Sequence, residues 1–264
     1  MITLVGDTEI AFDDVGSGLP VVFLHAFPLN RTMWEPQIGA LVAECRCIAI
    51  DFRGFGASKL CPPFTVDRYS DDVAAVLDSL QIERAVVVGL SMGGYVAFAM
   101  WRRHRARIRA LVLCDTRASA DNEETAERRR ALIDTARTQG ATAVANAQIS
   151  GLMGKSSRDK RPDIYDAMHR MMAQTPVEGI VGGLYALLGR PDSTPTLETI
   201  DVPTLVVVGD EDVITPPKEA RRLAEGIAGS RLEVLHGAGH LSNVERPAAF
   251  NTVVSEFLGT LIYN

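Results

Sequence analysis

The residues best suited to covalent chemistry lie in one glycine-rich stretch, residues 89–94, which reads GLSMGG. An apolar run over 85–88 precedes it and another over 95–101 follows it, so the pattern predicts a strand, a sharp turn and a helix. Gly89 and Gly93 leave room where the strand and the helix pass close together. We expect Ser91 to stand at the apex of the turn as a nucleophile, although a lone motif of this kind can also be a structural turn.

A serine nucleophile needs a base, because its hydroxyl reacts poorly at neutral pH. Histidine is suited to that role, since its pKa lies near neutrality. His240 lies in the glycine-rich loop 237–243, after a predicted strand and before the last helix, so it can reach the carboxyl edge of the sheet. His236, at the end of that strand, is the second candidate.

The acid that orients the imidazole has four candidates at two predicted strand ends. Asp210, Glu211 and Asp212 follow the strand over 205–208, and Asp115 follows the strand that ends at residue 114. Spacing alone does not separate these four residues.

Acyl transfer also requires donors for the developing oxyanion. The backbone N–H of Met92, at the start of the helix, is one candidate. The other is the N–H of Phe27, in the HAFP stretch after a predicted strand, because Pro28 has no N–H to donate.

Strand and helix signals alternate through the chain, except over residues 116–199, where the pattern is mostly helical. Strands are predicted over 1–5, 9–15, 20–25, 46–50, 85–88, 110–114, 202–208 and 232–235. Helices are predicted over 33–42, 66–80 and 95–101, and through the last segment to residue 261. An α/β sheet interrupted once by a helical insertion is the simplest architecture for this pattern.

Together these motifs resemble the α/β-hydrolase superfamily, and within it the small serine esterase and lactonase group. The resemblance covers nearly the whole chain and rests on residues 25–28, 51–58 (DFRGFGAS), 89–94, 209–216 and 237–240. Residues 238–247 (AGHLSNVERP) are similar to those of 3-oxoadipate enol-lactonases, carboxylesterases and acyl-homoserine-lactone hydrolases. One departure is Ala26, where the family usually has glycine after the histidine.

The resemblance implies a mostly parallel eight-stranded sheet flanked by helices, with a helical cap inserted after the sixth strand. Residues 1–116 and 200–264 would form the core and 117–199 the cap. It makes Asp212 the acid of the triad and Asp115 a pocket or structural residue, and the chain order Ser91, Asp212, His240 agrees. Ser91 also separates this chain from haloalkane dehalogenases and epoxide hydrolases of the fold, which use aspartate at that position.

The substrate pocket is expected to include large apolar residues from the cap and from the loops around the triad: Trp34, Met153, Met168, Met172, Ile214 and Leu241. The methionines have a second interpretation, since methionine also fills irregular gaps in cores and between a cap and a body. Four arginines of the insertion are expected to be solvated: Arg158, Arg161, Arg170 and Arg190.

Bulk properties restrict the partners. The 264 residues are 47% hydrophobic and 23% charged, as in an ordinary globular protein, and the net charge of −6 argues against nucleic acid. No secretory signal and no membrane-length apolar run are visible, so a cytoplasmic location without membrane association is expected. No cofactor or metal is implied, and the oligomeric state is left open.

The sequence therefore predicts a carboxylic-ester hydrolase that acts on a small ester or lactone through an acyl-enzyme. Three alternatives remain open. They are a cofactor-free perhydrolase of the haloperoxidase-like group, a C–C bond hydrolase, and a ligand-binding receptor with a slow triad.

Overall fold

The computed structural model describes residues 1–262 of the chain, and its core is one eight-stranded sheet. The strand order is β1-β2-β4-β3-β5-β6-β7-β8. β1 and β2 pair antiparallel, as do β2 and β4, and all the other pairs are parallel. The strands span Ile2–Val5 (β1), Thr8–Gly16 (β2), Leu19–Leu24 (β3), Cys45–Ile50 (β4), Ala85–Leu90 (β5), Ile108–Cys114 (β6), Thr204–Gly209 (β7) and Arg231–Leu235 (β8). The predicted, mostly parallel sheet is confirmed.

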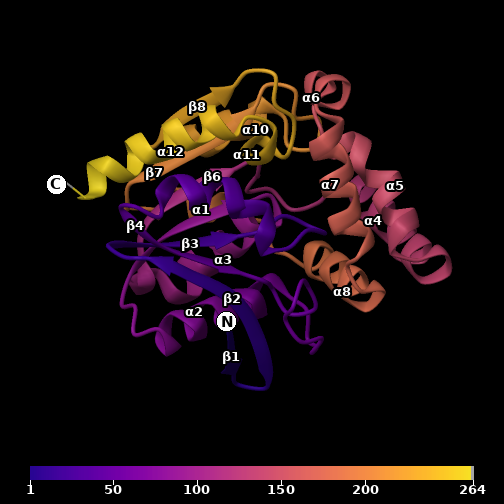
Figure 1. Cartoon of the computed structure of the whole chain (residues 1–264), viewed down its shortest axis with the longest axis horizontal. Coiled ribbons are helices and arrows are strands. Elements are labelled where there is room, and N and C mark those ends of the chain that lie inside the picture. The colour runs from indigo at the N-terminus through magenta and orange to yellow at the C-terminus, as the bar shows by residue number, and fades with distance from the viewer. Residues whose placement is uncertain (263–264) are drawn as a thin grey trace.

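Helices cover both faces of this sheet (Figure 1). Outside the insertion they are η1 (Arg31–Trp34), α1 (Glu35–Leu41), α2 (Val66–Ser79), α3 (Met92–His104), η2 (Arg105–Arg107), α10 (Pro217–Gly226), α11 (Ser242–Glu245) and α12 (Pro247–Ile262). One prediction was wrong in detail: the helix expected over 33–42 is a 3-10 turn followed by α1. Pro36 accounts for the break, since proline is favoured in the first turn of a helix and α1 starts there.

Alternate side chains of the central strands enter two separate hydrophobic cores. Val87 of β5 packs with α2 and α3, whereas Val86 and Val88 pack with α1 and α12 on the other face. A strand buried on both faces has no polar side to alternate with, which is why these strands appear in the sequence as continuous apolar runs.

A helical insertion leaves the sheet after β6 and returns to β7, as predicted. Its helices are α4 (Glu123–Gln139), α5 (Ala141–Leu152), α6 (Lys155–Lys160), α7 (Pro162–Ala173), α8 (Val177–Leu188) and α9 (Thr194–Leu197). Figure 1 shows α4 to α8 gathered at one end of the molecule, beside the sheet. Within residues 1–262, no helix combines the length and the apolar composition needed to cross a bilayer.

Candidate active site

Ser91 occupies a strained turn between β5 and α3. Its backbone lies at φ 55° and ψ −108°, a region that side-chain-bearing residues rarely adopt. The turn is tight because its neighbours are glycines: a Cβ on Gly93 would lie 2.1 Å from the carbonyl oxygen of Leu24, and one on Gly89 would lie 2.4 Å from that of Gly93. The close approach predicted from the glycine spacing is therefore present, and it holds the serine above the end of the sheet.

His240 bridges Ser91 and Asp212. Its Nε2 lies 2.8 Å from the Ser91 Oγ, and its Nδ1 lies 2.8 Å from the Asp212 Oδ2. With Nδ1 protonated toward the carboxylate, Nε2 is free to accept the serine proton. The structure thus brings together three side chains that lie up to 149 positions apart in sequence.

Asp212 is buried and remains ionised. Burial alone would raise its pKa, but the charge and hydrogen bond of His240, together with bonds from Thr215, lower the pKa below its ordinary value of 3.8. The amides of Ile214 and Thr215 donate to Asp212 Oδ1 at 2.8 and 3.0 Å, and the Thr215 hydroxyl donates to Oδ2 at 2.8 Å. These bonds fix the carboxylate that faces the imidazole.

The rival acid, Asp115, is bonded elsewhere. It accepts from the amide of Gly209 at 2.9 Å and contacts the Ser242 hydroxyl, so it connects β6 to β7 and α11. Burial and the nearby charge of Asp212 raise its pKa well above 3.8. Asp115 is therefore a structural group behind the triad.

The other rivals also lie apart from Ser91. His236 is an exposed residue whose Nδ1 lies 2.9 Å from Asp210 Oδ2, so these two candidates pair with each other at the surface. Glu211 accepts from the amide of Ser156 at 2.8 Å, on the side of the insertion.

Of the two predicted oxyanion donors, Met92 directly follows Ser91 and Phe27 lines the same cavity. Met92 is the first residue of α3, where amides have no acceptor within the helix. Phe27 follows β3 and lines the same cavity as Ser91. The loop that carries Phe27 is anchored by the fully buried His25, whose ring nitrogens bond the Ala26 carbonyl at 2.9 Å and the Phe52 amide at 3.1 Å. Burial lowers the pKa of His25 to about 4, so its ring is neutral near pH 7.

Comparison with known proteins agrees with this geometry. Residues 20–247 match the family model described as the alpha/beta hydrolase fold. The chain belongs to that family. This α/β-hydrolase is 32% identical over 235 residues to 3-oxoadipate enol-lactonase 2 of Acinetobacter baylyi, a match that covers 89% of the chain and 86% of that protein.

Two further relatives differ in their described activities. A thermophilic esterase from Thermogutta terrifontis, solved with malate bound, is 39% identical to this α/β-hydrolase with a TM-score of 0.94, over 97% of this chain and 94% of that one. A Mycobacterium tuberculosis protein named as a candidate non-heme bromoperoxidase, BpoC, is 31% identical over 263 residues, covering 96% of this chain and 98% of that protein. The relatives therefore share the fold but not one substrate.

A cavity of about 330 Å³ in this α/β-hydrolase contains both Ser91 and His240. Of the six predicted pocket residues, Ile214 lines it. The other five lie in the hydrophobic core instead: Trp34, Met153, Met168, Met172 and Leu241. Trp34, for example, packs between Phe23 and Phe250, with ring centroids 5.3 and 6.1 Å away.

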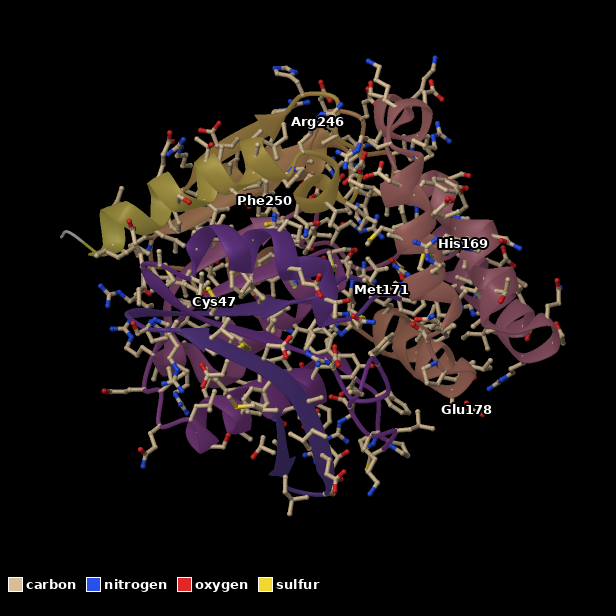
Figure 2. All side chains as sticks on the ribbon, in the orientation of Figure 1. Cys47, His169, Met171, Glu178, Arg246 and Phe250 are labelled. Carbon is tan, nitrogen blue, oxygen red and sulfur yellow. The ribbon has the colours of Figure 1, made fainter. Side chains whose placement is uncertain are left out.

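Met168 and Met172 lie on α7 and Met153 directly follows α5, and all three are buried in the hydrophobic core, so the packing interpretation describes their position. Figure 2 shows Met171 on the side of the insertion toward the core and His169 farther out on the same helix. His169 contacts the Asn146 side chain at 2.7 Å. Sequence reasoning could not place the methionines, because α7 presents apolar residues in the same way to a core and to a cavity.

Sequence reasoning missed the polar wall of the cavity, which consists of Arg117, Thr125, Arg128, Arg129 and Gln148. The signal was present: 125, 128, 129 and 132 recur at helical spacing and therefore share one face of α4. The expectation for Arg190 was wrong. Its side chain is buried, with Nη1 2.9 Å from the Asp121 carboxylate and the guanidinium 4.2 Å from the ring centroid of Tyr95.

Glu245 ties the insertion to the loop that carries His240. This buried carboxylate accepts from the amides of Gly239 at 3.0 Å, Leu241 at 3.2 Å and Gly154 at 2.9 Å. In addition, the His240 amide donates to the carbonyl of Leu152 at 3.0 Å. The end of α5 and the loop of His240 are thus joined by one backbone hydrogen bond and by the shared carboxylate of Glu245.

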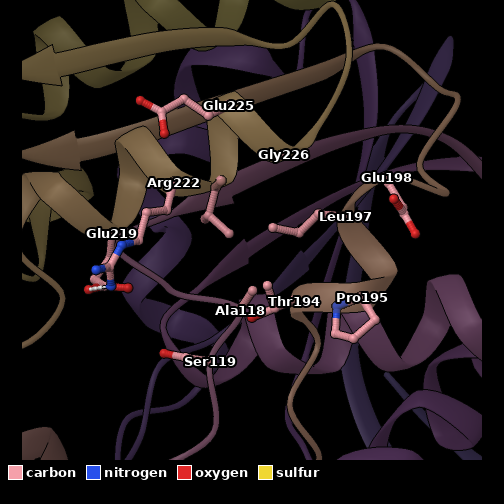
Figure 3. Close-up of a pocket in the computed structure, with 11 residues that line it drawn as sticks. Ala118, Ser119, Thr194, Pro195, Leu197, Glu198, Glu219, Arg222, Glu225 and Gly226 are labelled. Carbon is pink, nitrogen blue, oxygen red and sulfur yellow. Dashed lines mark hydrogen bonds and ion pairs between the residues drawn. The ribbon is translucent and has the colours of Figure 1, made fainter.

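A second, larger cavity of about 600 Å³ lies away from the triad, between α9, α10 and residues 118–119 (Figure 3). Its walls are mainly apolar, and its polar residues include the Glu219–Arg222 ion pair at 2.8 Å. Neither Ser91 nor His240 lines it. Of these two cavities, the smaller one is therefore the one that Ser91 and His240 line.

Proposed function

We propose that this α/β-hydrolase is a serine carboxylic-ester hydrolase that acts on small esters or lactones. Ser91 would be the nucleophile, His240 the base and Asp212 the acid that orients it. The observation that carries the proposal is the continuous chain of contacts from Ser91 Oγ through His240 to Asp212, with both distances 2.8 Å, beside an accessible cavity.

The geometry supports a two-step mechanism. Ser91 Oγ attacks the ester carbonyl while His240 Nε2 takes its proton, and the amides of Phe27 and Met92 bind the oxyanion. His240 then gives that proton to the leaving oxygen, and the acyl group remains on Ser91. Water, deprotonated by His240, attacks the acyl-enzyme; the bond to Ser91 Oγ breaks, His240 returns the proton to that oxygen, and the acid is released. With a lactone the leaving alcohol stays attached to the acyl group, so the opened product departs only after this last step.

The cavity volume supports a small substrate, since about 330 Å³ lies near the lower end of the range of about 300–1,000 Å³ for small-molecule sites. In this proposal residues 117–199 form a cap over a core made of 1–116 and 200–264. Leu132 and Leu152 of the insertion line the cavity opposite Phe27, and the exposed Val213 and Ile214 form its apolar rim.

The decisive experiment is steady-state hydrolysis of a p-nitrophenyl ester series and a lactone panel by the wild type and by Ser91→Ala. We expect multiple turnovers by the wild type and a loss of kcat on the order of 10⁶ in the variant, because the triad acts as a unit. Ser119→Ala, in the second cavity, is the matched control and should retain activity. Absence of turnover on every substrate with Ser91 intact would overturn the proposal.

A second candidate is perhydrolysis, favoured by the similarity to the bromoperoxidase-named relative. The same acyl-enzyme would be attacked by hydrogen peroxide instead of water and would release a peracid. Bromination of monochlorodimedone in the presence of acetate, bromide and peroxide measures it. Bromination that exceeds ester hydrolysis and is lost in Ser91→Ala would establish this activity as the principal one.

A further inference from the structure

The wall of the catalytic cavity is positively charged. Three arginines line it, namely Arg117, Arg128 and Arg129. Within residues 1–262, no aspartate or glutamate lines the same cavity. Asp212 lies behind His240 and is already bonded to it. An anion in this cavity would therefore meet guanidinium groups with no competing carboxylate on the cavity surface.

The charge is not cancelled behind the wall either. Asp121 is buried and pairs with Arg117 at 2.7 Å, Arg129 at 2.6 Å and Arg190 at 2.9 Å. Burial opposes ionisation of Asp121, but the hydrogen bonds and charges of Arg129 and Arg190 outweigh it and lower its pKa. One ionised carboxylate thus serves three guanidinium groups. The charge of Arg190 also interacts with Asp192, an exposed carboxylate that offsets part of the excess positive charge.

Arg117 has donor capacity that the protein does not use. Its Nη2 donates to Asp121 at 2.7 Å, and within residues 1–262 its Nη1 has no hydrogen-bond partner, although the residue lines the cavity. The Nε is buried without a partner and faces no open space, so the Nη1 N–H groups are the donors suited to a further anionic acceptor. Arg128 is less constrained, since its carboxylate neighbour Glu124 lies 3.7 Å away at the exposed surface.

We propose that Arg117 and Arg129 form an anion subsite in the catalytic cavity, and that the ester or lactone substrate carries a carboxylate. Arg128 would attract the anion at the cavity wall. The proposal rests on the esterase function proposed above and specifies its substrate class. The apolar residues Leu132, Val213 and Ile214 line the same cavity, so the substrate would combine a short apolar segment with one charged end.

The test compares two nearly isosteric esters: the p-nitrophenyl monoester of glutaric acid, which is an anion, and the p-nitrophenyl ester of glutaramic acid, which is neutral. We expect wild-type kcat/KM to favour the anion by about 10- to 100-fold, as a charge-assisted bond should. Arg117→Gln should reduce that ratio at least about tenfold. A wild-type ratio near one, or a ratio unchanged by Arg117→Gln, would overturn the proposal.

The matched control is Arg130→Gln. Arg130 lies on α4 beside Arg129, pairs with Glu123 at 2.7 Å at the surface and does not line the cavity. Arg130→Gln changes the net charge of the protein as Arg117→Gln does, so the ratio should stay within about twofold of the wild type. A fall as large as that of Arg117→Gln would show a general effect of net charge and would contradict a subsite.

A binding measurement separates the subsite from the catalytic proposal. Monomethyl glutarate, which is an anion, and the methyl ester of glutaramic acid, which is neutral, are titrated calorimetrically into Ser91→Ala and into the double variant with Arg117→Gln. Tighter binding of monomethyl glutarate, lost in the double variant, supports the subsite even where the wild type hydrolyses neither p-nitrophenyl ester. Equal binding of the two methyl esters would overturn the subsite, even where the wild type proves to be an esterase.

Discussion

His25 shows how one buried side chain can support the site without touching a substrate. It is fully buried beside Phe52 and Phe55, and both ring nitrogens are used to hold the loop that leads to Phe27. The neutral ring fits this position, because Nε2 must accept from the Phe52 amide. Protonation would remove that acceptor and place a charge among aromatic rings.

A pH prediction follows from His25. Its pKa is about 4 in the folded chain and 6.5 in an unfolded one, so the unfolded state binds the proton first as pH falls. Its contribution to the free energy of unfolding is complete above pH 6.5 and should fall by roughly 3 kcal/mol by pH 4. Denaturant unfolding between pH 7 and 4 measures it. His25→Gln should lose less free energy of unfolding as the pH falls from 7 to 4. His236→Gln, at the exposed histidine, should lose as much as the wild type.

The contact between Ser91, His240 and Asp212 could be predicted from the sequence because each residue lies at a strand end next to turn-forming residues. Ser91 follows β5, Asp212 follows β7 and His240 follows β8. The cavity wall could not be predicted in the same way. The helical spacing of 125, 128, 129 and 132 places these residues on one face of α4, but only the tertiary packing of the insertion decides that this face meets a cavity. Arg117 lies before α4 and has no such pattern.

At the scale of elements, the join between α5 and the loop 236–241 is the most vulnerable point. Glu245→Gln keeps the shape of the side chain but replaces one acceptor oxygen by an NH₂ group, which would face either the amide of Gly154 or the amides of Gly239 and Leu241. We expect a loss of about 1–3 kcal/mol in the free energy of unfolding, because a buried amide loses its acceptor. A fall in kcat should accompany it, since His240 lies in the same loop.

The control for this change is Glu256→Gln, at a surface glutamate 3.1 Å from Arg231. It should alter stability by less than about 0.5 kcal/mol, because exposed ion pairs contribute little. Urea unfolding compares the two variants. If Glu245→Gln proved as stable and as active as Glu256→Gln, the role given to this carboxylate would be wrong.

Elements differ in how well sequence predicts them. The strands β3 to β7 are buried on both faces, so their apolar runs indicate them to within two residues. For the insertion, the sequence indicates helices but not what each helix packs against. In α7, for example, no local pattern shows which residues Met168 and Met172 will contact. The break before α1 depends on Pro36. The helical spacing of the apolar residues around Pro36 predicted one continuous helix and so gave no indication of this break.

For the molecule as a whole, the insertion and the core should unfold together. The contacts between them reach beyond Glu245: the Thr175 hydroxyl donates to the Pro28 carbonyl at 2.9 Å, and Gly179 packs so closely on Gly54 that a Cβ would lie 1.9 Å from its oxygen. Both tryptophans, Trp34 and Trp101, are buried outside the insertion, so fluorescence reports on the core. Far-UV circular dichroism reports on all helices, including those of the insertion.

We therefore expect thermal unfolding followed by fluorescence and by circular dichroism to give coincident transitions. A circular dichroism transition that precedes the fluorescence transition by several degrees would show that the insertion melts first, contrary to the prediction. Thr175→Val, which removes one contact to Pro28, should lower both midpoints together.

The hydrogen bonds between Leu152, Gly154 and the loop of His240 also bear on protein engineering. Exchange of the whole insertion for that of a related enzyme would change substrate preference cleanly only if the donor segment placed a carbonyl and an amide at these two points. Without them the graft would shift the imidazole as well as the pocket. Chimeras of this fold should therefore retain the recipient's own residues 152–154. The exchange is best confined to α4, the first turns of α5, α7 and α8.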